Sequence, residues 1–401
     1  MFSRYSPCSK AIALAILACA QLVLGSAYAC PCAFDPSGPY TAAANAAMAS
    51  KDYAGALSYM AQALKYDKDN PNIIYNMALM YLATGNYQDA EANMIKSIDI
   101  LSNNYGKAHR QVAQGYIDLG ALYENQATDF NKPELKQKTE DCYMKSIALC
   151  EEIYSDVSGK PPAQSKQALQ TNSKESNSKH KSKKICDIDL KQAQIDLSGV
   201  MRHLADFYNT DDNYKQAEPL YSRALELEQK AYGPDNKEVC KHKADLAKFY
   251  CEASKPQLAE PLFKEVLASL EKNNELDSRA GVQVLYEYGN LYRDQDKYND
   301  AEIMLKRSVD VLSKLTPDEM DFAEKTSALA DVLDKQGKKA EAEKLCENLV
   351  ASLEKGGNKE ALMVALKQYH KHFLVLHNKI EAEKIAGKIK ILASQVSKDD
   401  R

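Results

Sequence analysis

One pattern of residue types recurs along this chain at a fixed interval. The segment from Asp52 to Leu64 aligns with the segment from Asn86 to Ile98, and tyrosine and alanine stand at the same places in both. A constant period of about 34 residues is typical of one supersecondary unit stacked many times, because a single unit cannot bury its apolar face alone. The repeat therefore predicts a solenoid whose stability depends on contacts between neighbouring units.

Each unit is predicted to hold two helices. Apolar and small residues fall at helical spacing over residues 77–81 and again over residues 90–97. We expect Ala78 and Ala90 where the two helices of a pair cross, and Ser97 where the next pair docks, because a larger side chain would push the backbones apart. The low counts of glycine (16) and proline (13) also favour long helices over a turn-rich β architecture.

This pattern resembles the tetratricopeptide repeat. The residues that carry the resemblance are Met77, Ala78, Tyr81, Gly85, Tyr87, Ala90 and the connection from Asp67 to Pro71. The second half resembles the longer repeat of kinesin light chains, because the motif around Ala217 recurs at Ala259 and again at Ala301, with a period of about 42 residues. The roughly eight extra residues are predicted to lengthen the second helix by about two turns. The resemblance implies an all-α superhelix of about eight helix-turn-helix repeats.

Composition shifts divide the chain into four predicted segments. They are a signal peptide (1–29), a first repeat block (37–154), a disordered Lys/Ser-rich linker (155–190) and a second block of the longer repeats (191–395). The linker lacks apolar periodicity, so it cannot bury enough surface to order itself. Within the blocks, an insertion is expected around residues 129–138, and a capping box led by Thr316 opens the seventh repeat.

Residues 1–29 have the pattern of an export signal. Arg4 and Lys10 precede an apolar run that ends at Leu24, and the small residues of Ala27-Tyr28-Ala29 come next. We therefore expect a periplasmic or extracellular protein whose mature chain begins at Cys30. Cys30 could also carry the lipid of a bacterial lipoprotein, although alanine replaces the usual leucine at position 27. A membrane partner is expected only if Cys30 is lipidated.

The even number of cysteines in the expected mature chain permits disulfides, but two pairings are disfavoured. Cys142 and Cys150 fall along one predicted helix, as do Cys240 and Cys251, and both spacings exceed the Cα separation that a disulfide tolerates. These residues are interpreted as small buried apolar groups.

The sequence lacks the common motifs of catalytic and cofactor-binding sites. It contains no glycine-rich phosphate loop, no nucleophile elbow and no metalloprotease helix, so neither an enzyme nor a cofactor is expected. The net charge of −4 gives no general attraction to nucleic acid. A metal-dependent alternative would depend on Cys30-Pro31-Cys32 or on His370, His372 and His377, of which the first and last histidines would share a helix face.

Binding residues are predicted from the resemblance, because the first helix of each pair lines the concave face of such a solenoid. In the first block the candidates are Asn45, Asn72, Tyr75, Asn76 and Leu79. In the second block they are Arg202, His203, Asp206, Lys241, Asp245, Lys248, Tyr286, Asn290 and Arg293. The mixed charges of the second set favour an extended peptide with both signs over a polyanion.

Two of these asparagines resemble part of a known peptide-binding arrangement. Asn45 and Asn76 have the spacing used by tetratricopeptide domains that clamp the C-terminal carboxylate of chaperones, where asparagines hold the peptide backbone. The lysines and arginine of that clamp are not matched, since Thr41, Gln114 and Asp118 stand in their places. The resemblance thus implies backbone hydrogen bonding without carboxylate capture.

Two functions follow from these observations. The first is a non-enzymatic scaffold that binds a protein or extended peptide outside the cytoplasm. The second is an envelope-anchored lipoprotein that acts as a structural or assembly component. The sequence identifies neither the partner nor the oligomeric state, because the solvent-facing residues of such repeats vary without harm to the core.

Overall fold

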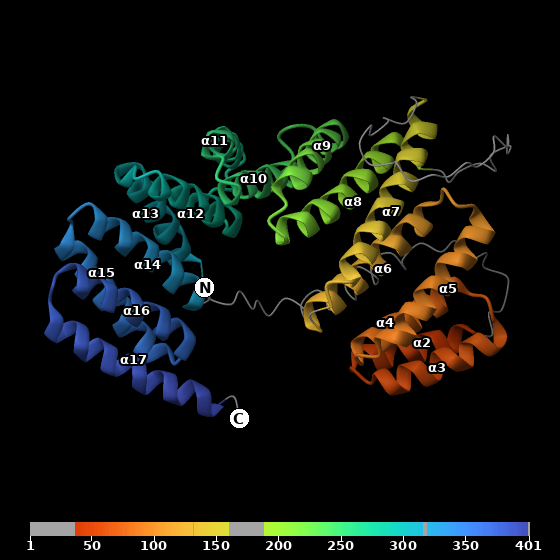
Figure 1. Ribbon diagram of the computed structural model, residues 1–401, viewed down its shortest axis with the longest axis horizontal. Helices are drawn as coiled ribbons and strands as arrows, with labels where there is room; N and C mark the ends of the chain where they lie inside the picture. Colours follow the sequence, from red (N-terminus) through yellow and green to blue (C-terminus); the bar gives the residue numbers. More distant parts are fainter. Residues whose placement is uncertain (1–36, 131, 160–187, 316–318, 400–401) are drawn as a thin grey trace. The chain divides into compact units, whose positions relative to one another are not determined.

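The computed structural model describes residues 37–130, 132–159, 188–315 and 319–399 (Figure 1). Within these ranges every regular element is an α-helix, which confirms the predicted all-α fold class. The predicted signal peptide, Cys30, the Cys30-Pro31-Cys32 motif and the capping residue Thr316 lie outside the described residues, as does most of the predicted linker. No helix of the described ranges is long and apolar enough to cross a membrane.

The helices form two compact units, divided after Tyr232, and pair in chain order within each. Unit 1 holds α2 (Gly38–Ala49), α3 (Tyr53–Tyr66), α4 (Pro71–Ala83), α5 (Tyr87–Tyr105), α6 (Arg110–Asp129), α7 (Leu135–Ser158), α8 (Leu190–Thr210) and α9 (Tyr214–Tyr232). Unit 2 holds α10 (Lys237–Glu252), α11 (Pro256–Lys272), α12 (Arg279–Asp294), α13 (Tyr298–Lys314), α14 (Glu319–Lys335), α15 (Lys339–Gly356), α16 (Lys359–Val375) and α17 (Lys379–Asp399). The described residues therefore hold eight helix pairs, as the repeat predicts.

The helices on either side of residues 160–187 pack directly against each other. The Tyr143 ring of α7 meets Phe207 of α8 with ring centroids 6.3 Å apart. The Tyr208 hydroxyl of α8 donates a hydrogen bond to Glu140 Oε1 of α7 over 2.6 Å. The compact units therefore do not coincide with the two blocks that the sequence predicts, because α8 and α9 belong with the repeats before them.

Small residues stand where the two helices of a pair cross. Ala78 and Ala90 are fully buried in the crossing of α4 and α5, as predicted. Gly120 takes the corresponding place in α6, where an added Cβ would lie 2.8 Å from Cε1 of Tyr143. The short side chains let the backbones approach closely.

In several pairs, a buried serine of the second helix donates a hydrogen bond to a backbone carbonyl of the first helix. Ser97, expected where the next pair docks, donates its hydroxyl to the carbonyl of Pro71 in its own pair over 2.9 Å. The same bond, also 2.9 Å long, runs from Ser146 to the Ala113 carbonyl and from Ser308 to the Val282 carbonyl. A hydroxyl on a short side chain reaches the facing backbone only where the helices are close, so each of these bonds marks a close contact within its pair.

The longer period of the second half is confirmed, but its extra residues are placed differently from the prediction. The second helices α9, α11 and α13 begin at Tyr214, Pro256 and Tyr298, at the same constant interval as the sequence motif. They are not two turns longer, since α11 and α13 have 17 residues while α3 has 14 and α5 has 19. The first helices also grow, from 13 residues in α4 to 16 in α10 and α12. Both helices of a pair share one interface, so lengthening one alone would leave its end unpacked.

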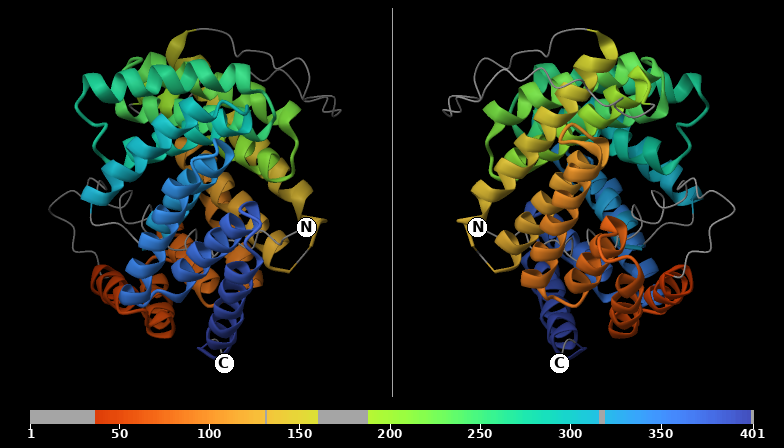
Figure 2. Two further views of the ribbon diagram at one scale, coloured as in Figure 1. Left: turned by 90° about the vertical axis from the view of Figure 1, so that its left-hand side faces the viewer. Right: turned by 90° about the vertical axis from the view of Figure 1, so that its right-hand side faces the viewer.

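The first helices of neighbouring repeats contact one another in unit 2. Helix α10 packs against α12, α12 against α14, and α14 against α16. Figure 2 shows these helices in the green to blue part of the ribbon. The corresponding second helices, such as α11 and α13, are not among the closely packed pairs. The first helices of unit 2 therefore lie on the inner side of the stack, where the sequence places the binding face.

Candidate functional site

The inner face of unit 2 carries a row of polar side chains on α12. Tyr286, Asn290 and Arg293 are spaced four and three residues apart, so they lie on one side of the helix, and all three are half-buried. The Lys325 ammonium of α14 lies 4.6 Å from the centre of the Tyr286 ring and also pairs with Asp321. Burial raises the pKa of Tyr286, so its hydroxyl stays protonated and can donate a hydrogen bond.

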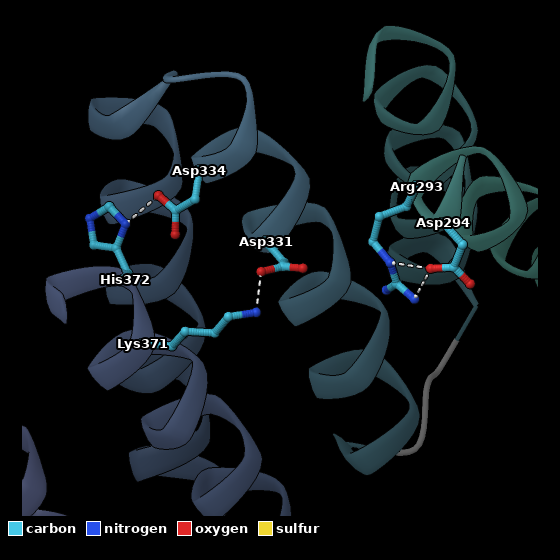
Figure 3. Close-up of polar contacts among 6 residues, drawn as sticks. All are labelled: Arg293, Asp294, Asp331, Asp334, Lys371 and His372. Atoms are coloured by element: carbon cyan, nitrogen blue, oxygen red, sulfur yellow. Dashed lines mark hydrogen bonds and ion pairs between the residues drawn. The ribbon is translucent and has the colours of Figure 1, made fainter. Parts of the chain in front are cut away.

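Two polar pairs join α14 to α16 (Figure 3). Lys371 binds Asp331, and Nδ1 of His372 lies 2.6 Å from Oδ1 of Asp334. On α12, Arg293 pairs with the neighbouring Asp294 over 3.1 Å. The Lys371–Asp331 and Arg293–Asp294 pairs each combine opposite charges, in keeping with the mixed charges of the sequence. Three other predicted contacts, Lys241, Asp245 and Lys248, are exposed along α10.

The C-terminal histidines do not gather into a metal site. His372 is fully buried against Asp334, while His377 lies beyond the end of α16 with a φ of 56°. His370 and His377 therefore do not share a helix face, contrary to the sequence interpretation, because the helix ends at Val375. The described ranges contain no group of three His, Cys, Asp or Glu side chains that could hold a metal ion.

In unit 1 a buried carboxylate joins two first helices. The Tyr75 hydroxyl of α4 donates to Oδ2 of Asp118 over 2.8 Å, and Nε2 of Gln114 donates to Oδ1 over 3.0 Å. Burial raises the pKa of Asp118 to about 6, although both hydrogen bonds act in the opposite direction. Two of the positions that hold basic residues in a carboxylate clamp thus form an internal network here.

The predicted contacts of α4 are only partly available. Asn76 and Leu79 are buried, with 9% and 2% of their surface exposed, so they cannot contact a partner at the surface. Tyr75 is half-buried, and Asn45 of α2 and Asn72 are exposed. Leu79 belongs to the apolar cluster that joins α4, α5 and α6. A carboxylate clamp requires both asparagines at the surface. Asn45 is exposed but Asn76 is buried by neighbouring helices, so the pair is not available to a ligand.

A cavity of about 150 Å³ lies between α6, α7 and α8 of the same unit. Its floor is apolar and includes Ala113, Cys150 and Val200, while Gln114 and His203 stand among its polar residues. Both of these are exposed, so the cavity opens to solvent. Although part of the His203 side chain is exposed, desolvation by the surrounding helices lowers its pKa, which favours the uncharged ring.

Two parts of the chain match models of a known repeat family. A tetratricopeptide repeat model matches residues 47–94, and a second model with the same description matches residues 196–272. The chain carries tetratricopeptide repeats. No curated protein matches the chain in sequence.

Two solved structures share the fold of this tetratricopeptide protein at low sequence identity, and a third is similar over a shorter part of the chain. The apo form of RapI is 10% identical with a TM-score of 0.55, and the match covers 86% of this chain and 82% of RapI. A signal transduction ATPase with a tetratricopeptide repeat sensor, from Pyrococcus horikoshii, is 10% identical with a TM-score of 0.56, over 99% of this chain and 55% of that protein. A putative kinesin light chain from Podospora anserina is 17% identical over 49% of this chain and 94% of its own length, with a TM-score of 0.46.

The remaining predicted contacts of the tetratricopeptide protein lie on α8. Arg202 pairs with the buried Glu228 over 3.3 Å, and Asp206 accepts a hydrogen bond from Tyr221. His203 lines the cavity between the first helices. Sequence reasoning missed Gly199, which also lines this cavity. A glycine inside a helical pattern, one turn before a predicted contact residue, is the signal that could have found it.

Proposed function

We propose that this protein is a non-catalytic scaffold that binds an extended polypeptide along the first helices of its repeats. The observation that supports this most directly is the half-exposed row of Tyr286, Asn290 and Arg293 on the inner face of unit 2. These side chains stand on one helix that is held between two neighbouring first helices. Contact residues held in place in advance reduce the entropy lost on binding.

The chemistry of this row suits a polypeptide. An asparagine side chain can donate to a backbone carbonyl and accept from a backbone N–H, and Asn290 is half-buried one turn after Tyr286 on this face. Arg293 keeps 29% of its side chain exposed and can bind a carboxylate or a carbonyl oxygen. Tyr286 adds an aromatic surface. The internal pairing of the other charges disfavours a ligand of one sign, which supports a polypeptide of mixed charge.

The proposal is tested by a pull-down with the full chain from envelope and secreted fractions. We expect a specific protein partner, and we expect the double substitution Tyr286→Ala and Arg293→Ala to reduce its recovery by at least tenfold. The matched control is Ile303→Ala with Arg307→Ala on α13, which removes an exposed apolar residue and an exposed arginine from a second helix. Equal loss in both variants, or no specific partner at all, would contradict the proposal.

We also propose that the protein acts outside the cytoplasm after residues 1–29 are removed. The basic residues, the apolar run and the small residues before Cys30 support this. The mass of the protein isolated from its source tests it, since a chain that retains residues 1–29 would refute export by this route.

The same mass measurement tests the alternative of a lipoprotein with a structural or assembly role. The position of Cys30 at the expected cleavage point favours that alternative. A mass increment of a diacylglycerol and a fatty acid on a chain that begins at Cys30 would support it, and an unmodified Cys30 would refute it.

A further inference from the structure

The cavity of unit 1 opens between the first helices of two successive repeats. Helix α6 contributes Ala113 and Ile117, α7 contributes Cys150, and α8 contributes Ile195 and Val200. Ala113, Cys150 and Val200 are among the most buried residues of the unit, with 2%, 4% and 0% of their surface exposed. The lining residues in the deep part of the cavity are therefore apolar, and a charged group placed against them would lose hydration without compensation.

The charges beside the cavity neutralise each other. Arg110 of α6 binds Asp196 of α8 through two contacts, Nε to Oδ2 at 2.6 Å and a terminal guanidinium nitrogen to Oδ1 at 3.0 Å. Asp196 also accepts a hydrogen bond of 2.8 Å from Gln192. A two-pronged arginine–carboxylate pair of this kind leaves little charge for a ligand. The rim therefore favours neither a carboxylate nor an ammonium group.

Two uncharged polar groups remain at the rim. Gln114 uses its Nε2 to bond Asp118 over 3.0 Å, which directs the donor inward and leaves the amide oxygen as the acceptor on the other side. The His203 ring is held nearly parallel to Tyr143, with ring centroids 6.2 Å apart, and it lines the cavity. An amide oxygen and a neutral imidazole together match the N–H and C=O of a peptide backbone.

The size of the cavity limits what can enter. A dry cavity of about 150 Å³ holds benzene, and the present cavity has about this volume. Leucine, isoleucine, methionine and phenylalanine have side chains of this order, while alanine would leave most of the space empty. Gly199 leaves one wall open, because a Cβ placed on it would meet no atom within 4 Å.

We propose that this cavity holds one uncharged apolar side chain, from leucine, isoleucine, methionine or phenylalanine, of the polypeptide that the scaffold binds. Gln114 and His203 bond the backbone on either side of that residue. The assignment rests on the proposed function and deepens it, since it names one element of the sequence that a partner must carry. It concerns unit 1, whereas the Tyr286 row lies in unit 2.

Gly199 allows the cavity to be filled from within. A leucine at this position of α8 would point toward the turn before it, where Ile195 and Asp196 line the cavity. Leucine also favours a helix over glycine, so Gly199→Leu is expected to fold. The matched control is Gly387→Leu on α17, because Gly387 lies inside a helix of unit 2 and its added Cβ likewise meets no atom within 4 Å.

The experiment measures binding of the full chain to end-blocked nonapeptide libraries, each with one fixed central residue and mixtures elsewhere. Burying the additional carbon atoms of leucine in a half-open cavity should improve binding about tenfold over alanine. Libraries with aspartate, lysine or tryptophan at the centre should bind no better than alanine. The preference should persist in Gly387→Leu and fall below about twofold in Gly199→Leu.

A preference that persists in Gly199→Leu would overturn the proposal. Benzene, observed by ligand-detected NMR, gives a reading that does not depend on peptide binding. It should bind the wild type and Gly387→Leu but not Gly199→Leu, and failure to bind the wild type would show that the cavity does not accept an apolar group. If benzene binds and no peptide library does, the cavity belongs to a small apolar ligand, which refutes the peptide assignment, while the pull-down with the Tyr286 and Arg293 substitutions decides the scaffold function separately.

Discussion

Replacing either Gly120 or Gly199 by alanine makes the same chemical change inside a first helix of unit 1, yet opposite effects on stability are expected. Each substitution gains about 1 kcal/mol from helix propensity. At Gly199 the new methyl group meets no atom within 4 Å, so the full gain should appear. At Gly120 the methyl carbon would lie 2.8 and 2.9 Å from two atoms of the Tyr143 ring.

Tyr143 cannot move aside cheaply. Its side chain is 1% exposed, and its hydroxyl donates a hydrogen bond of 2.8 Å to Oε2 of Glu124. Overpacking of a filled interior costs about 1–3 kcal/mol. Against the gain of about 1 kcal/mol, Gly120→Ala should destabilise the protein by up to about 2 kcal/mol. The two variants should therefore differ by about 1–3 kcal/mol in the free energy of unfolding.

Equilibrium urea unfolding followed by far-ultraviolet circular dichroism measures this difference. With an unchanged slope, Gly199→Ala should unfold at higher urea than the wild type and Gly120→Ala at lower urea. Gly387→Ala, also in open space, serves as a second reference for the propensity term. If Gly120→Ala is as stable as Gly199→Ala, the close approach of α6 and α7 is not a constraint and the reasoning fails.

Three further predictions concern buried polar groups. The pKa of Asp118 is raised from 3.8 to about 6, so its protonation favours the folded state, and the free energy of unfolding should fall by about 2 kcal/mol as the pH rises from 4 to 7. Asp118→Asn should remove this part of the pH dependence in urea titrations across that range, and an unchanged profile would disprove it. Asp334→Ala leaves Nδ1 of the fully buried His372 without its partner and should lower the unfolding free energy by about 1–3 kcal/mol in the same assay, more than an exposed Asp→Ala change such as Asp277→Ala. Burial raises the pKa of the Cys346 thiol to about 12, so iodoacetamide at pH 8 should modify it far more slowly in the native protein than in urea, and equal rates would show that α15 opens freely.

The sequence predicts the helix pairs well, because the period that reveals them is set by local contacts. Ala78 and Ala90 are small because the two helices of one repeat cross there, and this contact lies within a single repeat. The positions of Asn76 and Leu79 were harder to predict, since whether a first-helix residue is buried depends on the helices of the next repeat. The hydrogen bond from Tyr75 to Asp118 spans 43 residues and has no local signature.

The cavity of unit 1 could be predicted only in part. His203 was singled out because of its place on a first helix, but its neighbours Gly199 and Cys150 come from two helices separated by residues 160–187. The linker prediction separated these helices into two blocks, and only their packing brings the lining residues together. A repeat pattern describes each repeat separately, so it does not predict a site whose residues come from two repeats.

The serine bonds within helix pairs have a consequence for how such a chain can change over time. Ser97, Ser146 and Ser308 each hold the register of their own pair, and none depends on a partner elsewhere in the chain. A whole pair can then be duplicated or lost by recombination with its internal alignment intact. The number of pairs, and with it the length of ligand that can be accommodated, becomes adjustable in steps of one hairpin.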